Sequence, residues 1–126
     1  MKRSTLLVLL ALAVLGGCAS HNKYETEADK ITRAVIANDM TPVASDFAPA
    51  ISGQLTRVRV AELSDELNAQ GAYKGLKEDD QNCAPAAHCF DVTFEKRAYR
   101  EALALDDNGK VTAWRVHMGD AGSALP

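Results

Sequence analysis

The side chains with the most distinctive chemistry in this 126-residue chain are its three cysteines, Cys18, Cys83 and Cys89. A thiolate can act as a nucleophile, join a disulfide or bind a metal. Cys83 and Cys89 bound a seven-residue segment in which His88 precedes Cys89. Two hypotheses arise: a disulfide, or a metal site formed by the two thiolates and His88. The C-x-x-C spacing typical of zinc sites is missing, so the sequence favours no metal site.

General acid–base catalysis would need carboxyl, phenol or imidazole groups in a shared pocket. The candidates are Asp39, Asp46, Tyr73, Asp91, Tyr99 and His117. The two aspartates Asp39 and Asp46 lie at breaks in the helical pattern, where a cap or turn role is typical. The sequence contains no nucleophile elbow, dinucleotide fingerprint or phosphate-binding loop. We therefore assign no catalytic residue and expect no cofactor.

The first seventeen residues differ from the rest of the chain. Lys2 and Arg3 form a basic start, and Leu6 to Leu15 is an uncharged run of Leu, Val and Ala. Ten residues in a helix rise about 15 Å, roughly half the hydrocarbon thickness of a bilayer. This length is too short to span a membrane and is typical of the apolar region of a signal peptide.

The run ends in Leu15-Gly16-Gly17-Cys18, which resembles the lipobox of bacterial lipoprotein precursors. The resemblance implies a diacylglyceryl thioether on Cys18, cleavage after Gly17 and acylation of the new amino terminus. Two or three acyl chains make a stable membrane anchor. Ala19, where inner-membrane lipoproteins of Gram-negative bacteria carry Asp, implies the outer membrane, facing the periplasm. The alternative is an ordinary secretory signal that contains a cysteine.

Removal of residues 1–17 leaves 109 residues, with 12 basic and 17 acidic side chains and a net charge of −5. This acidic balance argues against nucleic acid and against electrostatic binding to anionic lipid. The expected partners are the membrane, through the lipid on Cys18, and a protein of the cell envelope. Because an exported chain meets an oxidising compartment, the remaining pair, Cys83 and Cys89, is predicted to form a disulfide.

Residues 18–24 are interpreted as the lipidated cysteine and a tether, 25–118 as a single domain, and 119–126 as a flexible tail. Helical spacing of Ala28, Ile31 and Val35 predicts a first helix from about residue 25 to residue 40. Prolines break the segment 41–52, where a short irregular helical stretch is expected. A third helix is predicted over 56–70, capped by Thr56 and ended by Gly71.

After Gly71 the period changes to that of strands. A short strand over 72–77 precedes a polar loop that contains the two cysteines. Phe90, Val92 and Phe94 alternate with polar residues and predict a half-buried strand. Tyr99, Glu101, Leu103 and Leu105 line one face of the next strand, and Asp106 to Gly109 is a turn signal. A last strand is predicted over 111–117.

Helices followed by an antiparallel meander predict an α+β fold, with two to three helices packed on a curved sheet of three to four strands. The helix break near Asp39-Met40, the closing Gly71 and the final hairpin over Asp106 to Val116 resemble small secreted bacterial domains of unknown function. Those domains belong to the nuclear transport factor 2-like, or cystatin-like, superfamily. The resemblance implies a cone-shaped interior between helices and sheet, and it implies no particular activity.

Tyr73, Tyr99 and Trp114 are the candidate walls of a ligand pocket in that interior. Each also has a structural interpretation, because aromatic residues in phase with apolar strand positions are typical of a core. Trp114 could instead present a stacking surface on the other sheet face. The leading functional hypothesis is a membrane-anchored extracytoplasmic domain that binds a partner without catalysis. The alternative is a small enzyme or small-molecule carrier that uses the cone interior.

Overall fold

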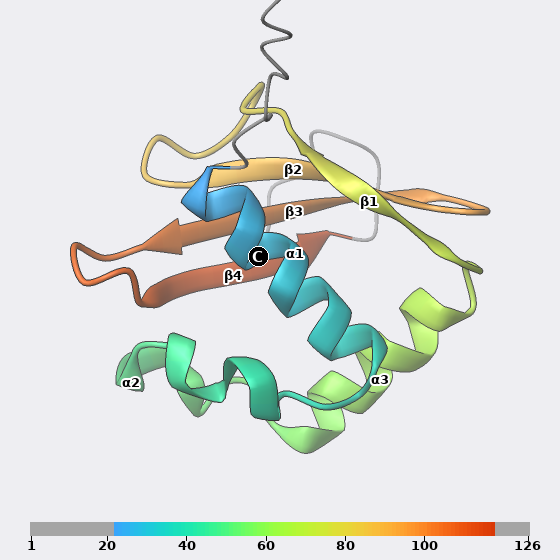
Figure 1. Cartoon of the computed structure of the whole chain (residues 1–126), viewed down its shortest axis with the longest axis horizontal. Helices are drawn as coiled ribbons and strands as arrows, with labels where there is room; N and C mark the ends of the chain where they lie inside the picture. Colours follow the sequence, from blue (N-terminus) through green and yellow to red (C-terminus); the bar gives the residue numbers. More distant parts are fainter. Residues whose placement is uncertain (1–21, 118–126) are drawn as a thin grey trace, which may run out of the picture.

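Helices come first and strands afterwards in the computed structural model, which describes residues 22–117 (Figure 1). The elements are α1 (Lys23–Ile36), η1 (Thr41–Asp46), α2 (Pro49–Ser52), α3 (Arg57–Asn68), β1 (Tyr73–Glu78), β2 (His88–Phe94), β3 (Ala98–Leu105) and β4 (Val111–His117). The predicted signal peptide, the predicted lipidation site Cys18, most of the predicted tether and the predicted tail 119–126 lie outside the described residues. Within 22–117, no helix is long and apolar enough to cross a membrane.

Helix α1 starts earlier and ends earlier than its pattern predicts. The Asn22 side chain caps the helix by accepting a hydrogen bond from the backbone N–H of Glu25 at 2.8 Å, so the helix begins at Lys23. At the other end, Asn38 adopts a left-handed backbone with φ of 51°. Asn tolerates this conformation better than most residues, and the helix ends before it, at Ile36. The predicted end at residue 40 was therefore wrong by four residues.

The other helical segments follow the sequence signals. The stretch 41–52 forms η1 and α2, each with a proline in its first turn. The Thr56 hydroxyl accepts a hydrogen bond from Arg59 N–H at 3.3 Å and caps α3. Gly71 follows α3 with φ of 84°, and a Cβ there would lie 2.8 Å from a carboxylate oxygen of Glu95. Glycine at this position is required by both its backbone angle and the close approach.

The four strands form one antiparallel sheet in the order β1-β2-β3-β4, in which neighbours in sequence are neighbours in space. The turn between β3 and β4 is closed at Asp106, whose N–H donates to Lys110 O and whose carbonyl accepts from Gly109 N–H. The α+β class and the antiparallel meander are thereby confirmed.

The core lies between α1 and one face of the sheet, called here the inner face. Helix α1 crosses β1, β2 and β3 (Figure 1), and α3 packs against α1. The inner-face positions of β2 and β3 are almost fully buried, as their alternation predicts: Phe90, Val92, Phe94, Tyr99, Glu101 and Leu103.

A β-bulge near the start of β4 decides which face each of its residues occupies. Val111 pairs with Leu105 and Ala113 with Ala104, so Thr112 is an additional residue in the ladder. Trp114 pairs with buried Leu103 and therefore lies on the inner face. In a regular strand, Thr112 and Trp114 would lie on the same face. Because Thr112 is the additional residue of the bulge, its exposure does not indicate the face of Trp114.

The loop between β1 and β2 is held by a disulfide and by one arginine. Cys83 and Cys89 are joined, with their Cα atoms 5.8 Å apart, as predicted. The Arg100 guanidinium donates to the carboxylates of Asp91 and Asp79 at 2.9 and 3.3 Å and to two backbone carbonyls of the loop. The loop is thus tied covalently to β2 and electrostatically to β3.

Replacement of both Cys83 and Cys89 by Ala should lower the free energy of unfolding by about 2 kcal/mol, because the disulfide restricts the unfolded chain. Denaturant melts of the mature polypeptide would measure the loss, and reduction of the wild-type protein should reproduce it. Alkylation of both thiols before reduction, in protein taken from the cell envelope, would contradict the bridge.

Candidate functional site

A buried carboxylate, Glu101, lies at the centre of the inner face. Its side chain has no exposed surface, and both of its oxygens accept hydrogen bonds. The Thr32 hydroxyl of α1 donates to one oxygen at 2.7 Å, and the Trp114 indole N–H of β4 donates to the other at 2.7 Å. Glu101 thereby connects β3 to the neighbouring strand β4 and to α1, which is distant in the sequence.

Burial changes the acidity of this carboxyl. The pKa of Glu101 is raised from 4.5 to about 7, chiefly because the charged form loses its contact with water. The hydrogen bonds from Thr32 and Trp114 oppose the rise, and the negative charge of Asp29 adds to it. Both protonation states are therefore populated near neutral pH.

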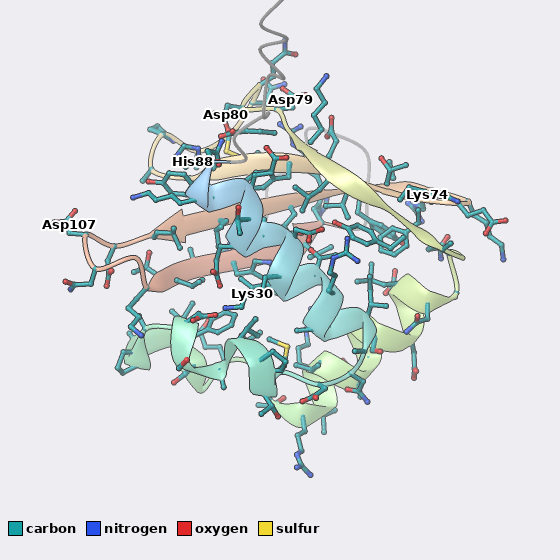
Figure 2. The ribbon with its side chains drawn as sticks, in the orientation of Figure 1. Lys30, Lys74, Asp79, Asp80, His88 and Asp107 are labelled. Atoms are coloured by element: carbon teal, nitrogen blue, oxygen red, sulfur yellow. A yellow bond between two sulfur atoms is a disulfide. The ribbon has the colours of Figure 1, made fainter. Side chains whose placement is uncertain are left out.

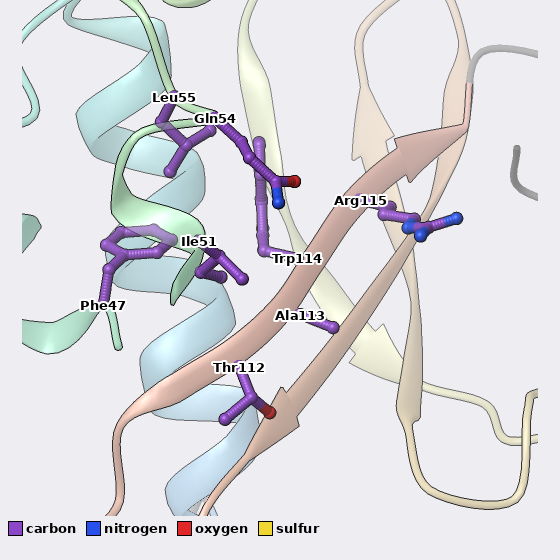
Figure 3. A pocket seen from close by; sticks show the side chains of 8 residues that line it. All are labelled: Phe47, Ile51, Gln54, Leu55, Thr112, Ala113, Trp114 and Arg115. Atoms are coloured by element: carbon purple, nitrogen blue, oxygen red, sulfur yellow. The ribbon is translucent and has the colours of Figure 1, made fainter. Parts of the chain in front are cut away.

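A cavity of about 220 Å³ lies beside Trp114, between the α2 region and β4 (Figure 3). Its walls are Phe47, Ile51, Gln54, Leu55, Thr112, Ala113, Trp114 and Arg115. Glu101 is not among them. The indole of Trp114 thus has two surroundings: its N–H is bonded to the buried carboxylate, while its ring forms part of a cavity wall.

The cavity lies along the outer edge of β4, which is the last strand of the sheet. At the start of that edge, the chain's own backbone is already bound: Ala48 N–H donates to Val111 O at 2.9 Å, and Phe47 pairs with Val111 in a parallel bridge. Across the described part of the chain, no strand pairs with the outer edge from Thr112 to Trp114. Backbone groups on such an edge are ready-made partners for another extended chain.

Tyr73 and Tyr99 lie apart from this cavity and are not among its lining residues. Both contact the Phe94 ring, at centroid distances of 5.5 and 5.6 Å. The Tyr73 hydroxyl donates to Asp29 at 2.7 Å, and burial together with this bond raises its pKa. Tyr99 is a core residue whose pKa is raised by burial, and within residues 22–117 its buried hydroxyl has no hydrogen-bond partner.

The other acid–base candidates are not brought together. The Asp39 carboxylate accepts from Thr41 N–H at 3.0 Å, which is the turn role expected for it. Asp46 pairs with Lys30, and Asp91 pairs with Arg100. His117 is at the end of β4 on the opposite face from Trp114, since it pairs with Arg100.

The disulfide uses both thiols, so a metal site made of Cys83, His88 and Cys89 is not formed. His88 instead faces two carboxylates. Its Nδ1 lies 2.7 Å from Glu78 Oε1 and 3.9 Å from Asp80 Oδ2. These ligand atoms all lie within 4.8 Å of one another (Figure 2 labels Asp80 and His88).

Sequence reasoning placed Glu101 on the inner stripe of β3 but did not single it out as a functional candidate. The sequence did contain a signal for Glu101, since its carboxylate is in phase with Tyr99, Leu103 and Leu105. A charged residue in a buried stripe requires hydrogen-bond partners, which marks it as unusual. Those partners, Thr32 and Trp114, could not be read from local periodicity.

Comparison with known proteins adds no relative: no protein-family model, curated protein or solved structure matches the chain.

Glu101→Gln should remove a pH dependence of stability. A carboxyl with a pKa raised from 4.5 to about 7 stabilises the folded state fully below pH 4.5, and this contribution is lost as pH rises through 7. The wild-type protein should therefore lose about 3 kcal/mol more than the variant between pH 4.5 and 8. Denaturant melts across this range would show it. Parallel stability profiles for the two proteins would contradict the raised pKa.

Proposed function

We propose that this chain is an extracytoplasmic lipoprotein, held on a membrane by lipid on Cys18, whose domain binds a polypeptide without catalysing a reaction. The lipobox-like sequence supports the anchor. Only four residues separate Cys18 from Lys23, the first residue of α1. The five steps from Cys18 to Lys23 reach at most about 18 Å when extended, so the domain would sit close to its membrane. Ala19 supports the outer membrane, with the domain facing the periplasm.

The observation that carries the binding function is the cavity along the outer edge of β4. An extended peptide can add to a free strand edge through backbone hydrogen bonds and place alternate side chains in neighbouring pockets. The bridge between Phe47 and Val111 shows that this edge already accepts one parallel backbone segment. A partner strand could continue from there along Thr112 to Trp114.

The size of the cavity favours a side chain over a free ligand. Small-molecule and cofactor sites usually occupy about 300 Å³ or more, whereas this cavity has about 220 Å³. Its lining combines apolar residues such as Ile51 and Leu55 with the polar Gln54 and Arg115. We infer that the occupant is one apolar side chain of an extended segment in an envelope protein.

A second candidate is the small enzyme or carrier, and the observation that favours it is Glu101. A carboxyl with a pKa of about 7 is suited to proton transfer at neutral pH. The nuclear transport factor 2-like or cystatin-like fold that we propose for this α+β domain would hold such a group in its interior. Against it, the carboxylate is fully buried and both its oxygens are bonded, so no substrate can reach it without displacement of Thr32 or Trp114.

The anchor is tested by Cys18→Ser. Loss of the thiol should abolish lipid attachment and leave the protein as an uncleaved precursor or free of the membrane. Metabolic labelling with palmitate, followed by membrane fractionation, measures both effects. Equal labelling of the variant and the wild-type protein would overturn the lipoprotein assignment.

The β4 edge is tested by a photo-cross-linking amino acid at exposed Thr112 of the full chain in cells. We expect one major polypeptide adduct, identified by mass spectrometry of the joined peptides. Gln54→Trp should fill the cavity and reduce the adduct about tenfold, the equivalent of roughly 1.5 kcal/mol for one buried side chain.

The matched control is Val58→Trp, which adds the same bulk on α3, where the Val58 side chain is 69% exposed. This variant should leave the cross-link unchanged. An adduct that responds equally to both tryptophans, or that is insensitive to Gln54→Trp, would exclude the cavity as the docking site.

A further inference from the structure

A second cluster of chemically capable side chains lies away from β4, where β1 ends and β2 begins. It consists of Glu78, Asp80 and His88, here called the hairpin cluster (Figure 2 labels Asp80 and His88). His88 Nδ1 lies 2.7 Å from Glu78 Oε1 and 3.9 Å from Asp80 Oδ2. Glu78 and His88 are half-buried, and Asp80 is exposed, so the cluster is open to ions from solvent.

The pairing of β1 with β2 brings these residues together. Glu78 lies opposite Phe90 in the ladder, and Asp79 N–H donates to Cys89 O just beyond it. Continuation of this register places Asp80 opposite His88, with Glu78 on the same side two residues earlier. Side chains at such positions project from one face and converge.

Each member of the cluster is held by a contact outside the three. Asp80 Oδ1 accepts from Cys89 N–H at 3.0 Å, which leaves Oδ2 directed at the imidazole. Asn22 donates an amide N–H to Glu78 Oε2, which leaves Oε1 for His88. The Tyr24 ring stacks on the His88 ring, with centroids 3.6 Å apart and planes at 20°.

These supporting contacts resemble the outer shell of a metal site, where hydrogen bonds and packing fix the orientation of the ligands. The disulfide adds a covalent constraint, because Cys89 both follows His88 and closes the loop that begins at Asp79. The cluster is therefore organised before any ion arrives, which lowers the cost of binding.

We propose that the hairpin cluster binds one divalent transition-metal ion of the zinc class, with Glu78 Oε1, Asp80 Oδ2 and His88 Nδ1 as ligands. An imidazole with two carboxylates suits borderline ions such as Zn²⁺, whereas Ca²⁺ and Mg²⁺ prefer oxygen alone and Cu⁺ prefers sulfur. Coordination by His88 Nδ1 and Glu78 Oε1 replaces the direct contact between these two atoms. Three protein ligands leave a coordination position open to water.

Binding of the ion would also act on the start of the domain. Asn22 caps α1 and bonds to Glu78, and Tyr24 stacks on His88. Both residues lie in the last part of the proposed tether, residues 18–24. A metal that immobilises Glu78 and His88 would therefore stiffen the point at which the domain joins its anchor.

The test is a titration of the mature, lipidated protein in detergent, after removal of metal with EDTA. Zn²⁺ should bind with one ion per chain by calorimetry, with Ca²⁺ and Mg²⁺ at least about a hundredfold weaker. His88→Ala and Asp80→Asn should each weaken Zn²⁺ binding about tenfold or more. His117→Ala, a substitution of another histidine on a distant strand, should leave the affinity unchanged.

Circular dichroism of each variant establishes that it is folded, and Asp80→Asn keeps the size and exposure of the native residue. Zn²⁺ binding that is unaffected by both cluster variants would place the ion elsewhere and overturn the proposal. The absence of saturable binding to the folded wild-type protein would overturn it equally, because His88 and Glu78 would then form only a hydrogen bond. Neither result bears on cross-linking at Thr112.

Discussion

The structure depends most on one carboxylate. Glu101 lies on the inner face of β3 and is bonded to Thr32 on α1 and to Trp114 on β4. A carboxylate without partners in this position would cost far more than any one apolar contact contributes, so the helix and the edge strand must lie where they can supply donors. The indole that forms a wall of the β4 cavity is oriented by this bond. The cavity is therefore a consequence of the core.

The hairpin cluster depends on a different constraint, the short loop between β1 and β2. The disulfide and the Arg100 guanidinium fix that loop on the sheet. This arrangement holds Asp80 beside His88, and α1 covers the imidazole through Tyr24. The β4 cavity and the hairpin cluster share no residue. A polypeptide on the β4 edge and a metal on the hairpin could therefore be bound by one domain at once.

The positions of the two sites make the lipoprotein hypothesis more specific about where the domain could bind its partners. The hairpin cluster contacts the first residues of α1, close to the proposed anchor, whereas the cavity lies between α2 and β4. Glu101 is enclosed by Thr32 and Trp114, and its raised pKa is explained chiefly by burial. These features support our proposal of a domain that holds a partner near a membrane.

The sequence by itself determined the local elements. Period-2 alternation, the Thr56 cap, Gly71 and the Asp106 turn are short-range signals, and the strands and α3 formed where those signals predicted them. The predicted export signal and an even cysteine pair also sufficed to predict the disulfide. Only the tertiary structure decided which polar groups meet, because Thr32 is 69 positions from Glu101 and the contact with Trp114 depends on the register of β3 with β4. The bulge at Thr112, which sets the face of Trp114, likewise depends on the register with β3. Periodicity assigns a residue to a face, but long-range pairing chooses its neighbours, and the chemistry of both sites depends on those neighbours.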